Sequence, residues 1–214
     1  MWFGDGSQAA KDAVNMAKEY VRNPGEYFNW TFIALLALVA AVYMNEVKNK
    51  NTRAIVGALA LYSVHWFYEI INACIGSGAG YPLWTVSASS STFILLIGVS
   101  WELSCMFSIA GTSVKLLPED RSKKILGIPN RLFAAVAMAV IFSAVEIFLA
   151  GQQAFIWVYK WWGAIPVCIT VYIPFFLAAY YVPDFKPKHQ KLFIGGLSAI
   201  NILLLIILIP LGII

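Results

Sequence analysis

Six long apolar stretches dominate this chain and decide the solvent in which it can fold. They occupy residues 29–45, 54–76, 91–114, 131–150, 155–182 and 191–213. Most approach or exceed the roughly 20 apolar residues that an α-helix needs to cross the hydrocarbon core of a bilayer. The pattern predicts an all-α fold, a polytopic transmembrane helical bundle with six spans.

The composition excludes the other broad classes. Only 12% of the 214 residues are charged and 60% are hydrophobic, whereas a soluble domain carries roughly 25% charged residues. Disordered chains are poor in apolar residues, so disorder is excluded as well. The net charge of +4 does not indicate a nucleic acid, because the basic residues gather in particular loops. We therefore expect membrane lipids, and no nucleic acid, as partners.

Charge is distributed unevenly over the loops. The first, third and fifth breaks, at residues 45–53, 115–131 and 184–191, hold eleven of the fifteen Lys and Arg residues and only four acids. The breaks at 76–92 and 150–155 carry no charge. The positive-inside rule places the three charged loops in the cytoplasm and both termini on the opposite side.

Residues 1–28 form a polar segment ahead of the six-helix transmembrane domain at 29–214. Small apolar residues recur at helical spacing from Ala10 to Val21, with charged residues between them, and Pro24 follows. This pattern predicts a short amphipathic helix at the outer membrane surface.

Four ionisable side chains fall inside the apolar stretches: His65, Glu69, Glu102 and Glu146. A charge at the bilayer centre costs on the order of 2.5–3.5 kcal/mol on insertion scales. We therefore expect these groups to face one another, water or a ligand.

The spacing of these groups predicts one polar pocket in the outer half of the bundle. His65, Glu69 and Asn72 share a helical face. Glu102 falls near the middle of the third stretch, and Glu146 in the outer half of the fourth. The residues expected to contact a substrate are Trp66, Tyr68, Asn72, Trp101, Glu146, Tyr159 and Trp162.

Such a pocket suits proton chemistry on an apolar substrate. A buried neutral carboxylic acid can protonate a carbon–carbon double bond, and aromatic faces stabilise the resulting cation. A second group then removes a proton elsewhere. We assign these catalytic roles to His65, Glu69 and Glu102. One intramembrane histidine gives no metal or haem site, so no metal or cofactor is expected.

Two families resemble parts of the sequence. The segment His65 to Glu69, followed by Trp101 and Glu102, is similar to the emopamil-binding, sterol isomerase family (EXPERA domain). That resemblance implies that His65 and Glu69 shuttle the proton and that Glu102 helps to stabilise the cation. Tyr68 and Glu69 also resemble an aromatic–Glu pair of integral-membrane terpene cyclases. The sterol isomerases have five spans and the cyclases seven, whereas this chain has six apolar stretches.

The leading hypothesis is thus an integral-membrane enzyme that isomerises or cyclises an isoprenoid or sterol-like lipid. One alternative is a proton-coupled carrier, or a substrate-binding transporter subunit, for a small hydrophobic or cationic solute. Another is a non-catalytic subunit of a membrane complex, in which Glu146 pairs with Lys160 only to join two spans. The sequence leaves open whether the bundle acts alone, as a homo-oligomer or in a larger complex.

Overall fold

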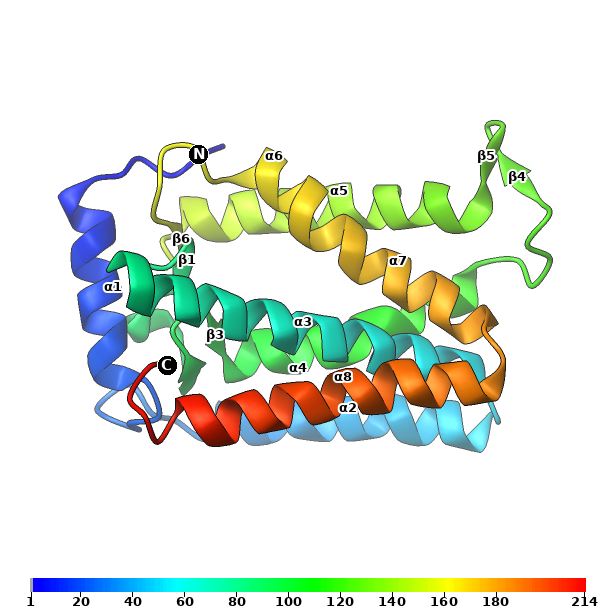
Figure 1. Cartoon of the computed structure of the whole chain (residues 1–214), viewed down its shortest axis with the longest axis horizontal. Helices are drawn as coiled ribbons and strands as arrows, with labels where there is room; N and C mark the ends of the chain where they lie inside the picture. The colour runs from blue at the N-terminus through cyan, green and yellow to red at the C-terminus, as the bar shows by residue number, and fades with distance from the viewer. Residues whose placement is uncertain (1) are drawn as a thin grey trace.

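The computed structural model describes residues 2–214, which are mostly helical. The longer helices other than α1 run back and forth along a common direction, which is horizontal in Figure 1. The helices are α1 Gln8–Tyr20, α2 Thr31–Lys48, α3 Thr52–Ala79, α4 Trp101–Ala110, α5 Asn130–Gly151, α6 Ala164–Val167, α7 Ile173–Tyr181 and α8 Pro187–Leu208.

Within residues 2–214, five helical segments are long and apolar enough to cross a membrane. Four are α2, α3, α5 and α8, and the fifth is the continuous segment Ala164–Asp184, which includes α6 and α7. Five of the six predicted spans therefore have a counterpart of sufficient length.

The third apolar stretch, residues 91–114, is the exception and does not form one helix. Its first part is extended, and α4 begins only at Trp101. Hydroxyl side chains that bond to nearby backbone compete with helix formation, and here Ser91 Oγ donates to the carbonyl of Ser87. α4 has 10 residues, about 15 Å of helix, before it tightens into 3₁₀ turns over Gly111–Leu116.

Short antiparallel ribbons lie at both ends of the bundle. β1 (Trp84–Val86) pairs with β6 (Phe155–Trp157), β2 (Ile94–Leu96) with β3 (Val99–Ser100), and β4 (Lys124–Ile125) with β5 (Ile128–Pro129). The first two ribbons lie beneath α1, at what we call the capped end (Figure 1). The third lies at the opposite, charged end, which holds residues 45–53, 115–131 and 184–191.

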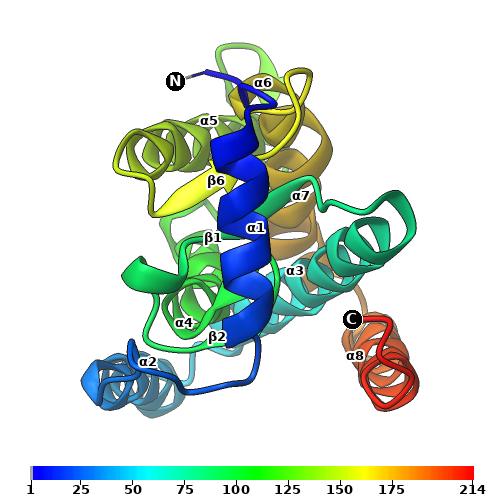
Figure 2. The same cartoon turned by 90° about the vertical axis from the view of Figure 1, so that its left-hand side faces the viewer.

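The predicted amphipathic helix is α1, and it closes the capped end. Ser7 caps it by accepting a hydrogen bond from the amide of Ala10. Its apolar face, with Val14 and Ala17, is buried because α1 lies across the ends of the other helices, in front of β1 and β6 (Figure 2). α1 therefore packs on protein along its apolar face.

The core lies between α3, α5 and α7, where the fully buried side chains include Leu61, Phe176 and Tyr180. Gly57 of α3 permits a close approach between the backbone of α3 and its neighbours. A Cβ at Gly57 would lie 2.8 Å from the carbonyl oxygens of Gly111 and Ala179. α3 therefore touches the backbones of two neighbouring segments at one point.

α2 and α8 lie at the periphery and expose most of their surface. Among the described residues of α8, Asn201 alone is buried. Its side-chain amide donates to the carbonyl of Ser63 at 2.8 Å, and the hydroxyls of Ser63 and Ser198 lie 3.0 Å apart. Polar contacts of this kind hold helices together where surrounding lipid removes the hydrophobic drive for association.

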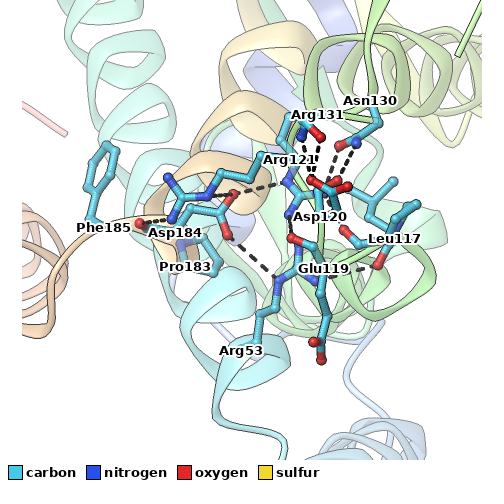
Figure 3. A network of polar contacts seen from close by, with 12 residues as sticks. Arg53, Leu117, Glu119, Asp120, Arg121, Asn130, Arg131, Pro183, Asp184 and Phe185 are labelled. Atoms are coloured by element: carbon cyan, nitrogen blue, oxygen red, sulfur yellow. Dashed lines mark hydrogen bonds and ion pairs between the residues drawn. The ribbon is translucent and has the colours of Figure 1, made fainter. Parts of the chain in front are cut away.

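At the charged end, three arginines surround one carboxylate (Figure 3). Asp184 accepts a hydrogen bond from Arg131 Nε at 3.0 Å and lies 3.3 Å from Arg121 Nε and 4.0 Å from Arg53 Nε. Arg131 is 3% exposed and also donates to the carbonyls of Pro118 and Glu119. Asp184 thus joins α3, the 115–131 loop and the end of α7.

Gly57→Ala should destabilise the fold by about 1–3 kcal/mol, because the added methyl overlaps two backbone carbonyls in a packed core. The measurement is the Tm of the purified protein in detergent. Gly195→Ala in α8 is the matched control, because a Cβ there meets nothing within 4 Å and alanine favours a helix. An equal loss in both variants would contradict the close approach.

Asp184→Asn should lower the Tm strongly, because removing the charge of a buried ion pair costs about 3–5 kcal/mol. The Asp184 side chain is 11% exposed. Arg121→Gln is the control, since that side chain is 64% exposed and an exposed pair contributes about 1 kcal/mol or less. Similar losses in the two variants would show that Asp184 does not hold this end together.

Candidate functional site

A small cavity lies between α3, α4, α5 and the helix that includes α6 and α7, next to β1 and β6. Two carboxylic acids, Glu69 from α3 and Glu146 from α5, line it together. No basic side chain among the described residues lines it. Its aromatic walls are Trp84, Phe107, Phe142, Phe155, Tyr172 and Phe175.

The Glu69 carboxyl is buried beside a buried histidine. Its Oε1 lies 3.4 Å from Nε2 of His65, one turn earlier in α3. The His65 ring stacks on Phe107, with centroids 4.4 Å apart. Oε2 of Glu69 and Nδ1 of His65 have no hydrogen-bond partner among the described residues. The predicted His65–Glu69 pair is therefore present, and one of its carboxyl oxygens is free for a ligand or water.

Glu146 reaches the same cavity from the opposite side. Nε1 of Trp157, in β6, donates a hydrogen bond of 2.7 Å to Oε1 of Glu146, and Oε2 has no partner among the described residues. The ion pair with Lys160 that the sequence offered as an alternative does not form, because Lys160 is exposed and lies beside Gly6 near the N-terminus.

A π turn over Cys168–Tyr172 brings Tyr172 to the cavity. Pro174, which follows, has no N–H to donate to the carbonyl of Thr170, so regular α-helical bonding fails there. The Thr170 hydroxyl donates to the carbonyl of Pro166 at 2.7 Å. π turns inside α-helices are frequent at functional sites. The helical distortion between Pro166 and Pro174 thus contributes a cavity residue.

The side chain of Asn72, on α3, forms hydrogen bonds with β1 and the residue before it. Its Oδ1 accepts from the amides of Leu83 and Trp84 at 2.8 and 3.3 Å, and its Nδ2 donates to the carbonyl of Trp84 at 2.9 Å. Gly98 packs against this junction, where a Cβ would lie 2.6 Å or less from Asn72, Trp84 and Glu69 Oε2. Asn72 therefore holds the wall of the cavity.

Three aromatic residues of the predicted pocket lie around the cavity. Trp162 stacks on Trp84, with centroids 5.9 Å apart and planes within 14°. Tyr68 meets Phe175 edge to face, and the Tyr159 hydroxyl donates to the carbonyl of Tyr81 at 2.9 Å. These side chains support the cavity walls from outside without lining the cavity.

Glu102, Trp66 and Trp101 lie elsewhere. Glu102 is half-buried in the first turn of α4, where its Oε1 accepts from the amide of Thr92 at 2.8 Å. A carboxylate is stabilised at a helix N-terminus by the helix dipole. Trp66 packs toward α8 and Trp101 toward Phe32 of α2. Glu102 is thus not among the residues that line the cavity, which Glu69 shares with Glu146.

The sequence analysis did not identify Trp84 and Tyr172, which line the cavity. It also did not identify Trp157, which donates a hydrogen bond to Glu146. The two tryptophans belong to uncharged loops whose pairing joins distant parts of the chain. The pair of prolines around residue 170 was the available signal for Tyr172.

The cavity is small and reaches the side of the bundle. Its volume is about 30 Å³, enough for one or two waters. Leu103 and Met106 of α4 and Val145 of α5 line it, and Val145 is 43% exposed on the outer surface of the bundle. The gap between α4 and α5 is therefore where the cavity comes nearest to surrounding lipid. Within residues 2–214, no three His, Cys, Asp or Glu side chains form a group that could hold a metal ion.

Comparison with known proteins places the chain in a family. Residues 11–210 match the model of a family described as an uncharacterized membrane protein family. The chain belongs to this family. It is therefore an integral membrane protein, and this match gives no support to the resemblance to sterol isomerases or terpene cyclases.

A relative from the archaeon Archaeoglobus fulgidus, described as an uncharacterized protein, is 36% identical over 206 residues. The match covers 94% of this chain and 95% of the relative. No solved structure matches the chain.

Trp157→Phe should destabilise the protein by about 1–3 kcal/mol, because it leaves the buried Glu146 carboxyl without its donor. A double-mutant cycle with Glu146→Leu, read by Tm, isolates this bond. Trp157→Phe should cost less when Glu146 is already Leu.

Trp161→Phe is the matched control, because Trp161 is exposed and forms no bond with Glu146. Additive losses of Trp157→Phe and Glu146→Leu would contradict the assigned hydrogen bond.

Proposed function

We propose that the protein is an intramembrane enzyme that isomerises or cyclises an isoprenoid or sterol-like lipid by acid/base chemistry. One observation carries the proposal. Two carboxyls, each with an unpartnered oxygen among the described residues, meet in an aromatic cavity that nears the lipid-facing surface between α4 and α5.

Glu69 is the proton donor in this proposal. Its carboxyl lines the cavity, and its Oε2 has no partner among the described residues. The O–H bond of Glu69 breaks as its proton forms a C–H bond at one alkene carbon, which leaves a cation at the neighbouring carbon. His65, 3.4 Å from Glu69, holds the carboxyl in position. After turnover Glu146 releases to water the proton that it took from the substrate, and His65 passes a proton from water to Glu69, which restores both groups.

Glu146 is the base. Its Oε1 accepts the Trp157 N–H bond, which leaves Oε2, without a partner among the described residues, to take up a proton. Its carboxylate removes a proton from a carbon next to the cation, and a new double bond forms. In a cyclisation, a second double bond of the substrate first attacks the cation. One proton enters and one leaves, so the reaction is balanced without a further reactant.

The aromatic walls supply the remaining requirement. Phe107, Tyr172 and Phe175 line the cavity together with the two acids, and aromatic rings attract a cation without capturing it. A lipid enters this space only when the side chains at the α4–α5 gap, such as Met106, move aside. The unbranched side chain of Met106 adapts readily to such movement.

We also propose the membrane topology that the loop charges favour. α4 and its 3₁₀ extension run from the capped end toward the charged end (Figure 1), which gives six crossings together with the five longer segments. The charged end faces the cytoplasm and both termini lie outside. The Glu69–Glu146 cavity then lies in the outer half of the bilayer.

A second candidate is a proton-coupled carrier for a small cation. The observation that favours it is the cavity volume of about 30 Å³, which suits an ion or a water better than a lipid. Buried carboxyls and histidines mark ion and proton pathways in membrane bundles. Uptake into proteoliposomes that depends on a proton gradient would support the carrier over the enzyme.

Glu69→Gln and Glu146→Gln should each abolish turnover, because an amide neither donates a carboxylic proton nor accepts one. The measurement uses purified protein in nanodiscs, incubated in D₂O with squalene, geranylgeraniol and a sterol alkene. Proton-initiated chemistry transfers one deuterium to carbon in each product, which mass spectrometry detects.

Glu19→Gln is the control, because Glu19 is exposed on α1, outside the cavity. Turnover that survives in both cavity variants would contradict the proposed enzyme activity and would leave the two acids with a structural role. Loss of turnover in Glu102→Gln but not in Glu146→Gln would contradict our assignment of the base.

A further inference from the structure

The β4–β5 hairpin at the charged end is held firmly by the start of α5. Asn130 is fully buried, and its side-chain amide donates to the carbonyls of Asp120 and Lys123 at 2.9 and 2.6 Å. Its backbone amide also donates to the carbonyl of Lys123. The base of the hairpin, and with it the direction of the strands, is therefore fixed relative to α5.

The tip of this hairpin is apolar where turn chemistry favours a polar residue. Leu126 and Gly127 form the two-residue loop with φ angles of 52° and 80°. Positive φ at both positions is typical of a type I′ turn, in which Asn or Gly is preferred at the first. Leu126 adopts this unfavourable backbone conformation and is 86% exposed. A large apolar side chain thus projects at a strained position.

The hairpin points sideways from the bundle. In Figure 1 it leaves the end of α5 at a steep angle to the helix axis, and in the end-on view of Figure 2 it extends beyond the outline of the helices. In a membrane crossed by α5, this direction runs along the membrane surface. Ile128 next to the tip, and Leu132 and Val136 one turn apart on α5, are also exposed apolar residues.

The charge of the hairpin is positive. Lys123 and Lys124 are exposed, neither forms an ion pair with an acid of the described chain, and residues 122–129 contain no Asp or Glu. An apolar tip flanked by lysines suits the boundary between acyl chains and anionic headgroups. A soluble protein partner would not require the apolar surface to continue onto a lipid-facing helix.

We propose that the β4–β5 hairpin is an interfacial anchor that binds anionic lipid. Leu126 enters the boundary between headgroups and acyl chains, and Lys123 and Lys124 bind the headgroups. The anchor sets the depth of α5, and with it the depth of the charged end, in the leaflet that contacts it. This role is independent of the chemistry in the cavity.

The test places an environment-sensitive NBD fluorophore at the tip, as Leu126→Cys in a chain whose three native cysteines are replaced by alanine. The protein is reconstituted in nanodiscs of phosphatidylcholine alone or mixed with phosphatidylglycerol. In the mixed discs we expect blue-shifted emission, strong quenching by lipids with a shallow doxyl group and protection from aqueous iodide.

The matched control carries the probe at Glu119→Cys, an exposed polar position in the same loop, which should stay accessible to iodide in both discs. Adding Lys123→Gln and Lys124→Gln to the tip-labelled protein should reduce its blue shift in mixed discs to that in phosphatidylcholine. The Tm of each labelled protein establishes that the bundle is folded.

Iodide quenching at the tip as strong as at the Glu119 position, in both discs, would overturn the proposal and leave the tip in water, as a soluble partner requires. A blue shift equal in both discs and insensitive to the lysine changes would overturn the role of anionic lipid. An unlabelled Leu126→Asn variant, which suits the turn better, should keep its Tm and lose the extra stability that phosphatidylglycerol gives the parent protein.

Discussion

The side-chain amide of Asn72 bonds to the backbone of Leu83 and Trp84, and much of the capped end depends on this junction. It sets the position of β1, which pairs with β6 and so brings Trp157 to Glu146. It also sets the position of the Trp84 ring, which stacks on Trp162 and lines the cavity. A single buried amide can hold β1 in place because an unpaired polar group is costly in apolar surroundings. The Asn72 amide makes three hydrogen bonds with the backbone of Leu83 and Trp84.

The two ends of the bundle satisfy their polar groups in different ways. At the charged end, arginines and lysines bind carboxylates and loop carbonyls, with Asp184 and Glu46 as the central acids. At the capped end, uncharged loops pair their backbones in short ribbons and bury Trp84, Phe155 and Trp157 beneath α1. The absence of charge from these loops in the sequence is thus explained by their burial.

Periodicity and length were sufficient to predict the α1 helix, most of the spans and the loops that gather at the charged end. These features follow from local hydrophobic pattern. The helical face shared by His65, Glu69 and Asn72 could also be predicted from local sequence, because one helix carries all three residues. The positions of the other site residues depend on burial and on contacts between elements. Glu102, expected near the middle of a span, therefore lies in the first turn of α4.

Contacts between residues far apart in the sequence could not be predicted from it. The contact of Trp157 with Glu146 depends on the three-residue turn between α5 and β6 and on a strand, β1, far earlier in the chain. The extended conformation of residues 91–100 likewise depends on hydroxyl groups and on the tight approach of Gly98 to Glu69. Apolar content alone cannot distinguish such a segment from a helix.

The pairing of β1 with β6, and the bridge of Phe3 to Gly163, also fix an order of assembly. Synthesis proceeds from the N-terminus, so α3 and Glu69 enter the membrane before β6 has been translated. Until then Glu69 has neither its cavity nor its opposite carboxyl. Closure of the capped end is therefore a late event in biogenesis, since it requires both α5, which carries Glu146, and β6 to have been synthesised.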